Sequence, residues 1–148
     1  MNIEQYNEQI GKHNLFFRLL GGRLTFMEDG HAEAEMPTGR DHANPNNTVH
    51  GGVLMTLADV TSGAAARSTG HGCTTLECKM NFLRPAKVGT TLFSVAETLH
   101  MGRRTGVYDC RIYDEDRKLI AVSTVTMFLF ESQDEARREG ERITGTQA

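Results

Sequence analysis

The sequence predicts an α+β domain in which an antiparallel β-sheet wraps around one long central helix. Two observations lead to this prediction. From Val53 to Ala66, nine of fourteen residues are apolar, and they fall on every side of a helical wheel. After this segment, four runs alternate between apolar and polar residues, as half-buried strands do. A helix without a solvated face must be covered on all sides, and only the strands can cover it.

The segment before the central helix predicts a helix, a hairpin and a loop. Apolar residues at helix-like intervals indicate an amphipathic helix over about residues 3–20, broken near Gly11 and closed by Gly21-Gly22. The stretch GRLTFMEDGHAEAEMP contains two short alternating runs around the turn signal Asp29-Gly30, which is typical of a β-hairpin. A polar loop then runs from residue 37 to residue 48.

The segment after the central helix predicts four strands. The runs are TTLECKMNFLRP, TTLFSVAETLHM, RTGVYDCRIYD and KLIAVSTVTMFLF, and the separators between them are short and turn-like. Short separators favour an antiparallel meander. Residues 131–148 have little to bury, so we expect a frayed, partly helical tail. No repeat or linker divides the sequence, and its 148 residues suit a single domain, 1–148.

Composition excludes several classes of protein. The formal net charge of −3 provides no basic field for nucleic acid or for an anionic membrane surface. No apolar run approaches the roughly 20 residues needed to cross a bilayer. Cys73, Cys78 and Cys110 are odd in number and lack metal-ligand spacing. We therefore expect a cytoplasmic protein with reduced thiols and no metal.

Asp59 is the one carboxylate in the central helix. Burying an unpaired carboxylate is costly, and the positions one turn away hold Met55, Thr56, Ser62 and Gly63, none of which is cationic. One explanation is structural: a hydrogen bond at the solvent or at a subunit interface. The other is a catalytic carboxylate.

Gly51 and Gly52 stand where the central helix should begin. First-turn N–H groups lack helical partners and carry the positive end of the helix dipole, so they can bind an anion or a developing oxyanion. The pair can also serve only as a tight turn. Asp59 lies eight residues from Gly51, about 12 Å along a helix. One chain therefore cannot bring both to one carbonyl, and we predict a dimer with shared active sites.

Three stretches together resemble a known family. They are Asn44, the run VHGGVLMTLAD over residues 49–59 and the run KMNFLRPAKVG over residues 79–89. In these the sequence resembles the hotdog-fold acyl-CoA thioesterases, specifically the phenylacetate-pathway (PaaI-like) branch, over roughly residues 20–130. The resemblance implies a hotdog fold that forms dimers and often tetramers, and hydrolysis of acyl-CoA thioesters without a metal or organic cofactor.

The resemblance also implies roles for individual residues. Gly51 would donate its N–H to the thioester carbonyl, and Asp59 of the partner subunit would be the catalytic carboxylate. Asn44 matches a residue that helps to hold water or substrate, and Thr75 matches a strand hydroxyl near the acid. Family members with Glu at position 59 carry Ser or Thr one turn later. This sequence has Gly63 there, so the aryl-CoA preference of those enzymes does not transfer.

The chemistry leaves several alternatives open. Asp59 can act as general base or as nucleophile. His50 can act directly, although we favour a ring that hydrogen-bonds the loop before the helix and fixes Gly51. Enoyl-CoA hydration or dehydration, and non-catalytic acyl-CoA binding, remain alternative functions on the same fold. The acyl group, and dimer against tetramer, are not decided.

CoA carries phosphates, and a local basic patch would have to bind them. The candidates for contacts with substrate or CoA are Gly52, Arg84, Arg103 and Arg104, with Lys87 a weaker one. Arginine suits phosphate because its planar fork binds two oxygens at once. As surface residues, these arginines can equally be solvated without a ligand.

Overall fold

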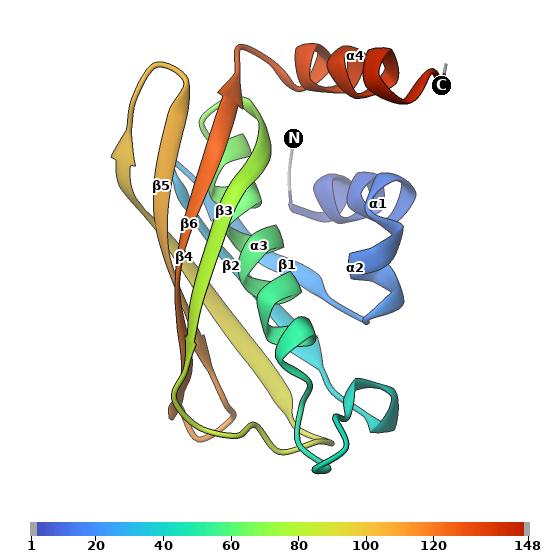
Figure 1. The fold of residues 1–148 in the computed structure, drawn as a ribbon, viewed down its shortest axis with the longest axis vertical. Coiled ribbons are helices and arrows are strands. Elements are labelled where there is room, and N and C mark those ends of the chain that lie inside the picture. The colour runs from blue at the N-terminus through green and yellow to red at the C-terminus, as the bar shows by residue number, and fades with distance from the viewer. Residues whose placement is uncertain (1–2, 147–148) are drawn as a thin grey trace.

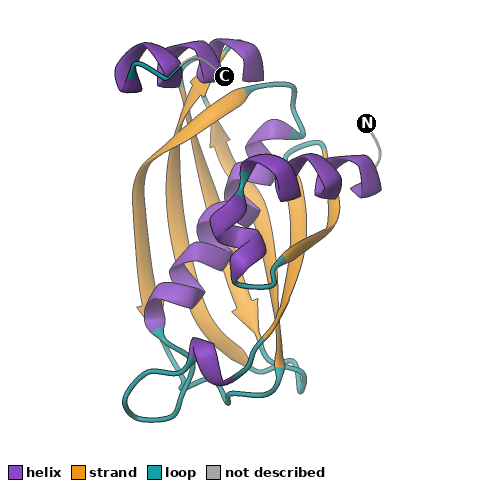
Figure 2. Cartoon of the chain, turned by 90° about the vertical axis from the view of Figure 1, so that its right-hand side faces the viewer, coloured by secondary structure: helices purple, strands orange, loops and turns teal. Residues whose placement is uncertain are grey.

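Six antiparallel strands form one sheet, and a long helix lies along one face of it (Figures 1 and 2). The computed structural model describes residues 3–146, except for the side chains of residues 10 and 11. The sheet order is β1-β2-β4-β5-β6-β3, and helix α3 contacts all six strands. This architecture confirms the α+β class with a long central helix.

The elements have the following bounds. The strands are β1 (Arg23–Glu28), β2 (His31–Pro37), β3 (Gly72–Phe82), β4 (Thr91–Met101), β5 (Thr105–Tyr113) and β6 (Leu119–Phe130). The helices are α1 (Ile3–His13), α2 (Leu15–Leu19), α3 (Gly51–Arg67) and α4 (Gln133–Thr144), with a short 3₁₀ helix at Arg40–His42. Within residues 3–146, no helix is long and apolar enough to cross a membrane.

The hairpin β1–β2 is confirmed. Asp29 and Gly30 form its turn with φ values of +47° and +84°, the left-handed conformations that a two-residue hairpin turn requires. The polar loop that follows contains the 3₁₀ turn at Arg40–His42.

The N-terminal helix breaks later than expected. The break lies at Asn14 and not near Gly11, because the Asn14 side chain accepts a hydrogen bond from the N–H of Phe17 (3.1 Å) and so caps a new helix, α2. Phe17 is fully buried and anchors α2 in the core.

The meander is correct only for β4, β5 and β6. Strand β3 does not pair with β4; it pairs antiparallel with β6 and forms the edge of the sheet. The separator after β3 is a crossover and not a hairpin turn, since Val49 donates to the carbonyl of Ala86 (2.9 Å) and Thr48 bridges Lys87. These contacts hold the segment between β3 and β4 beside the loop that precedes α3.

The central helix is less covered than its composition predicts. Every residue from 60 to 66 is buried, but in the first half Gly52 and Met55 are exposed and Thr56 and Asp59 are partly exposed. These four positions share one face of the helix. A single sheet covers the opposite face, so this stripe stays open in the isolated chain.

The tail after β6 is a regular helix, α4. Ser132 caps it by accepting from the N–H of Glu135 (3.1 Å), and Gly145 ends it with φ +68°. Helix α4 packs on β3 and β6, where the backbone of Gly72 closely approaches Ala136.

Candidate active site

Helix α3 begins with one unused N–H group. His50 is the N-cap: its ring Nδ1 accepts from the N–H of Gly52 (2.9 Å), and its carbonyl accepts from Val53 (3.0 Å) and Leu54 (3.4 Å). The N–H of Gly51 has no acceptor among residues 3–146. At the positive end of the helix, Gly51 therefore presents a free donor, whereas the Gly52 donor is already occupied.

His50 holds the helix start through its cap. Because Nδ1 accepts a hydrogen bond, it carries no proton, and in the neutral ring the proton is on Nε2. The bond runs to Gly52 in the first helical turn and not to the preceding loop; the backbone N–H of His50 makes the loop contact, to the carbonyl of His42 (2.8 Å). The His50 side chain is exposed.

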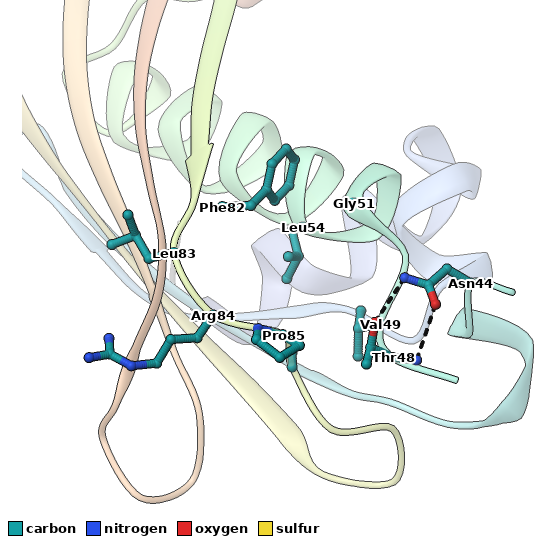
Figure 3. A pocket seen from close by; sticks show the side chains of 10 residues that line it. Asn44, Thr48, Val49, Gly51, Leu54, Phe82, Leu83, Arg84 and Pro85 are labelled. Atoms are coloured by element: carbon teal, nitrogen blue, oxygen red, sulfur yellow. Dashed lines mark hydrogen bonds between the residues drawn. The ribbon is translucent and has the colours of Figure 1, made fainter. Parts of the chain in front are cut away.

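A hollow of about 260 Å³ lies beside Gly51 (Figure 3). Its lining comes from the loop before α3, the helix start and the end of β3, namely Asn44, Thr48, Val49, Gly51, Leu54, Phe82, Leu83, Arg84, Pro85 and Ala86. A Cβ at position 51 would lie 3.1 Å from the ring of Phe82. Glycine therefore keeps the free N–H accessible at this hollow.

Asn44 lies in the lining, where it also holds the loop together. Its Oδ1 accepts from the N–H groups of Asn46 (2.9 Å) and Thr48 (3.2 Å), and its Nδ2 donates to the Thr48 hydroxyl (2.8 Å). Figure 3 shows this contact at the rim of the hollow. The geometry assigns Asn44 to shaping the loop that leads into Gly51.

Asp59 and Thr75 lie together. The Thr75 hydroxyl donates to Asp59 Oδ1 (2.5 Å) and also lies 3.4 Å from the sulfur of Met127. The carboxylate is partly exposed and has no direct ion pair with a cation of the described chain. Thr75 fixes the direction of the carboxylate without neutralising its charge.

Within one chain, Asp59 and Gly51 remain apart. They stand on the same helix eight residues, or about 12 Å, from one another. Strand β3 runs alongside in the opposite direction, so Phe82 lies at Gly51 while Thr75 lies at Asp59. Neither Asp59 nor Thr75 lines the hollow at Gly51.

The candidate phosphate-binding residues lie at opposite ends of the sheet. Arg84 lines the hollow and donates to the carbonyl of Leu119 (2.8 Å), at the beginning of β6. Arg103 and Arg104 lie in the β4–β5 turn, and the carbonyl of Arg104 accepts from Leu129, near the end of β6. The Arg84 N–H donates to the carbonyl of Ile120, and Leu129 lies nine residues further along β6. Arg84 and Arg104 are therefore about 30 Å apart.

Arg104 borders a second hollow of about 470 Å³ between the sheet and α4. Its guanidinium carbon lies 5.9 Å from the ring centre of Phe128, and two arginines of α4, Arg138 and Arg142, also line the hollow. Lys87 is exposed near the first hollow, beside Thr48. Among residues 3–146 there is no cluster of three or more His, Cys, Asp or Glu that could hold a metal ion.

Sequence reasoning missed one residue close to Asp59. Arg67 lies two turns further along α3, and its guanidinium extends back over Gly63. Arg67 lies beyond the positions one turn on either side of Asp59, none of which is cationic. The signal that could have found Arg67 is the spacing of four and eight residues that puts Asp59, Gly63 and Arg67 on one helical face.

Comparisons with known proteins agree on one family. Residues 46–121 match the family model described as the thioesterase superfamily. The acyl-coenzyme A thioesterase PaaI of Escherichia coli K12 is 34% identical over 71% of this chain and 75% of its own length.

Solved structures extend the similarity to the fold. The E. coli PaaI protein from the phenylacetic acid degradation operon superimposes with a TM-score of 0.78 at 30% identity, covering 85% of this chain and 92% of that one. A thioesterase protein of Streptococcus pneumoniae TIGR4, described as hypothetical and solved with coenzyme A, has a TM-score of 0.78 at 27% identity, covering 84% and 98%.

Proposed function

The chain belongs to the thioesterase superfamily, and we propose that it hydrolyses an acyl-CoA thioester to the free acid and CoA. The hotdog fold and the PaaI-like resemblance are confirmed by the same comparisons. The observation that carries the proposal is the free N–H of Gly51 at a hollow, on the helix that also holds the Asp59 carboxylate. Together they supply an oxyanion donor and a base or nucleophile.

The proposal requires two copies of the chain, and the edge strand β3 offers the surface for pairing them. Its outer edge has no partner strand in the described chain. Leu76, Phe82 and Leu83 are 58%, 53% and 49% exposed, which is unusual for large apolar residues on an unpartnered edge. We infer a dimer in which β3 pairs antiparallel with β3 of the partner subunit.

The bulge in β3 supports a particular register. Thr75 and Phe82 are seven residues apart and would point to opposite faces of a regular strand, but the irregularity between Thr75 and Glu77 turns both toward α3. Antiparallel pairing centred on Lys79 would put Phe82 of one copy opposite Leu76 of the other, next to Thr75. Gly51 of the partner subunit would then lie beside Asp59.

In the shared site the reaction would run as follows. Water attacks the carbonyl carbon while one of its protons passes to Asp59, and the Gly51 N–H stabilises the charge that grows on the carbonyl oxygen. The C–S bond then breaks, and the proton is transferred to the leaving thiolate. In the alternative route, Asp59 itself attacks and water hydrolyses the resulting anhydride. Thr75 orients Asp59, and His50 fixes the turn that carries Gly51.

The same dimer would gather the candidate arginines. Although Arg84 and Arg104 are about 30 Å apart in one chain, antiparallel pairing reverses the partner, so Arg84 of the partner subunit would reach the level of Arg104. Across the paired sheets, Arg104 and Arg84 of the partner subunit would be three strand spacings, or about 15 Å, apart. Arg84, Arg103 and Arg104 thus remain candidates for the CoA phosphates, contributed by two subunits.

Thiol release from short, long and aromatic acyl-CoAs tests the reaction. We expect the wild type to release thiol and Asp59→Asn to be at least about a hundredfold slower, because the amide is neither base nor nucleophile. The melting temperature of the variant should be unchanged or higher, since a carboxylate without a direct ion pair is removed. Tight acyl-CoA binding without hydrolysis by the wild type would instead indicate a binding module, and turnover of enoyl-CoA without thiol release a hydratase.

Replacing Gly51 tests the oxyanion donor separately. Gly51→Pro removes the N–H at the first helical position, where proline is tolerated, and His50 already has the extended backbone (φ −62°, ψ 137°) that a following proline requires. Gly51→Ala is the matched control, since it meets Phe82 in the same way but keeps the N–H. We expect the proline variant to lose about 10²–10³ in kcat and the alanine variant far less.

Mixing the two inactive variants tests whether the sites are shared. A heterodimer of Asp59→Asn and Gly51→Pro would contain one site with both native residues. Random mixing gives half heterodimers with one intact site of two, so activity should return to about a quarter of the wild-type value. A site within one chain predicts no recovery.

A further inference from the structure

Apolar residues make up most of the lining of the hollow at Gly51. Figure 3 shows the side chains of Val49, Leu54, Phe82 and Pro85 around it. Such side chains bind apolar groups, because both surfaces are removed from water on contact. The hollow therefore suits the apolar acyl part of a thioester better than the pantetheine arm of CoA, whose amide groups need hydrogen-bond partners.

The polar side chains of the lining are already engaged. Asn44 and Thr48 bond each other, the amide of Asn44 donating to the Thr48 hydroxyl (2.8 Å). The side chain of Arg84 points away from the hollow in Figure 3 and donates to the carbonyl of Leu119 (2.8 Å). The backbone N–H of Gly51 has no acceptor in the described part of the chain, so the carbonyl of a ligand would lie there.

The hollow is small. Its volume of about 260 Å³ lies below the roughly 300–1,000 Å³ of pockets that enclose drug-sized ligands. At about 30 Å³ for each heavy atom, the share that a water molecule takes in the liquid, it holds roughly eight to nine heavy atoms. It therefore has room for a short or medium-length acyl group but not for CoA itself.

Phe82 stands at the end of the hollow nearest the free N–H. A Cβ on Gly51 would lie 3.1 Å from Cζ and 3.2 Å from Cε1 of its ring. In a helix each Cα–Cβ bond tilts toward the N-terminus, the direction in which the first N–H groups also point. The ring is therefore beside the place of a carbonyl bound to Gly51, and at 53% exposure much of its surface is free to contact a ligand.

We propose that Phe82 is a specificity-determining residue of the thioesterase site, whose ring excludes acyl groups that branch at the carbon next to the carbonyl. That carbon lies closest to the ring, so a branch there meets it, whereas a later branch lies deeper in the hollow. This inference rests on the proposed function and names its substrate class. The class is acyl groups of up to about eight carbons that are straight or branch further from the carbonyl.

Two isomeric substrates isolate the effect of the branch. α-Methylbutyryl-CoA and isovaleryl-CoA contain the same atoms, and only the first branches at the carbon next to the carbonyl. We expect the wild-type kcat/KM to be at least about tenfold higher for isovaleryl-CoA, the discrimination that one methyl group gives in an apolar pocket. In Phe82→Ala this ratio should fall at least about fivefold, because the space of the ring becomes available to the branch.

Leu83→Ala is the matched control. Leu83 is the next residue of the chain, is 49% exposed against 53% for Phe82, and points away from the hollow in Figure 3, so this variant should keep the wild-type ratio. Phe82→Leu retains part of the apolar bulk and should give an intermediate ratio, which preserves the test if Phe82→Ala folds poorly. Weaker pairing of the open edge would slow both substrates equally and cancel in the ratio.

The outcomes distinguish this inference from the proposed function. A Phe82 that only supports the fold predicts a lower melting temperature with an unchanged ratio. A hollow that holds the pantetheine arm predicts an equal rise in KM for both isomers. Either result, equal wild-type kcat/KM values for the two isomers, or a wild-type preference for hexadecanoyl-CoA over octanoyl-CoA overturns the proposal, and the thioesterase stands. Absence of hydrolysis of every acyl-CoA by the wild type overturns both.

Discussion

The two edges of the sheet differ in ways that bear on function. Strand β1 has six residues and a bulge between Leu24 and Phe26, and its outer edge is blocked, since the Asn7 side chain on α1 bonds both the carbonyl (2.7 Å) and the N–H (3.0 Å) of Leu24. Strand β3 has eleven residues, exposes Leu76, and has no partner strand on its outer side in the described chain.

The difference means that one edge is closed and the other is open, as the proposed dimer requires. Proteins blunt free edges with short strands, bulges and covering elements, and β1 uses all three. The bulge of β3 does not blunt its edge, because it instead turns Thr75 and Phe82 to the face of α3. The open edge is thus the one next to Asp59.

The largest effect expected is from breaking the open edge. Leu76→Asp would put a charge opposite the apolar Phe82 of the partner subunit, so we expect a monomer by light scattering and a loss of at least about a hundredfold in thiol release. Phe26→Asp on β1, at 40% exposure against 58% for Leu76, is the matched control and should leave the oligomer and the rate intact. Equal losses in both variants would contradict the comparison.

Cross-linking sharpens the register of the pairing. With Lys79 at the centre, Lys79→Cys would put two thiols directly opposite, with Cβ atoms about 4.5–5.5 Å apart, close enough for a disulfide after small adjustment. We expect most of this variant to form a covalent dimer on a non-reducing gel after mild oxidation. Thr124→Cys, its neighbour on β6, should remain monomeric on the gel. If Thr124→Cys formed the cross-link and Lys79→Cys did not, the twofold axis of the dimer would not lie at β3.

A smaller effect is expected from opening the closed edge. Asn7→Ala removes both side-chain hydrogen bonds to Leu24, so we expect the free energy of unfolding to fall by about 1–3 kcal/mol in urea denaturation. The oligomer and the rate of thiol release should not change. A new, larger assembly would mean that Asn7 is what keeps β1 from pairing.

The smallest effect expected is the pH dependence of stability at His31, the first residue of β2. Burial alone would lower the pKa of His31, but hydrogen bonds and charge from Glu33 and Glu97 outweigh it and raise the pKa. A raised histidine pKa gives stability that is complete below about pH 6.5 and is lost as pH rises through the folded-state value. We expect the melting temperature of His31→Gln to depend less on pH between about pH 6 and 8. The difference in stability from the wild type should be below about 1 kcal/mol, because Glu33 and Glu97 are solvent-exposed. A wild-type melting temperature that rises over this range would contradict the assignment.

Local patterns were sufficient for most of the fold. Alternation predicted the strands, Asp29-Gly30 predicted its hairpin turn, and the apolar run predicted α3, because each signal depends on neighbours in the sequence. The break in the N-terminal helix was misplaced, since the cap by Asn14 depends on a single side chain. Around the candidate site, the family resemblance implied that Thr75 lies near Asp59, and the structure brings the two together.

The tertiary structure alone decided which strands and side chains are neighbours. The sequence by itself determined most of the elements and the separation of Gly51 from Asp59, and it predicted a second copy. It could not determine that β3 leaves the meander for the edge next to β6, because short separators fit a hairpin and a crossover equally well. Nor could it determine that Arg67 turns back over Gly63, since a long flexible side chain takes its direction from packing against α1, β3 and α4.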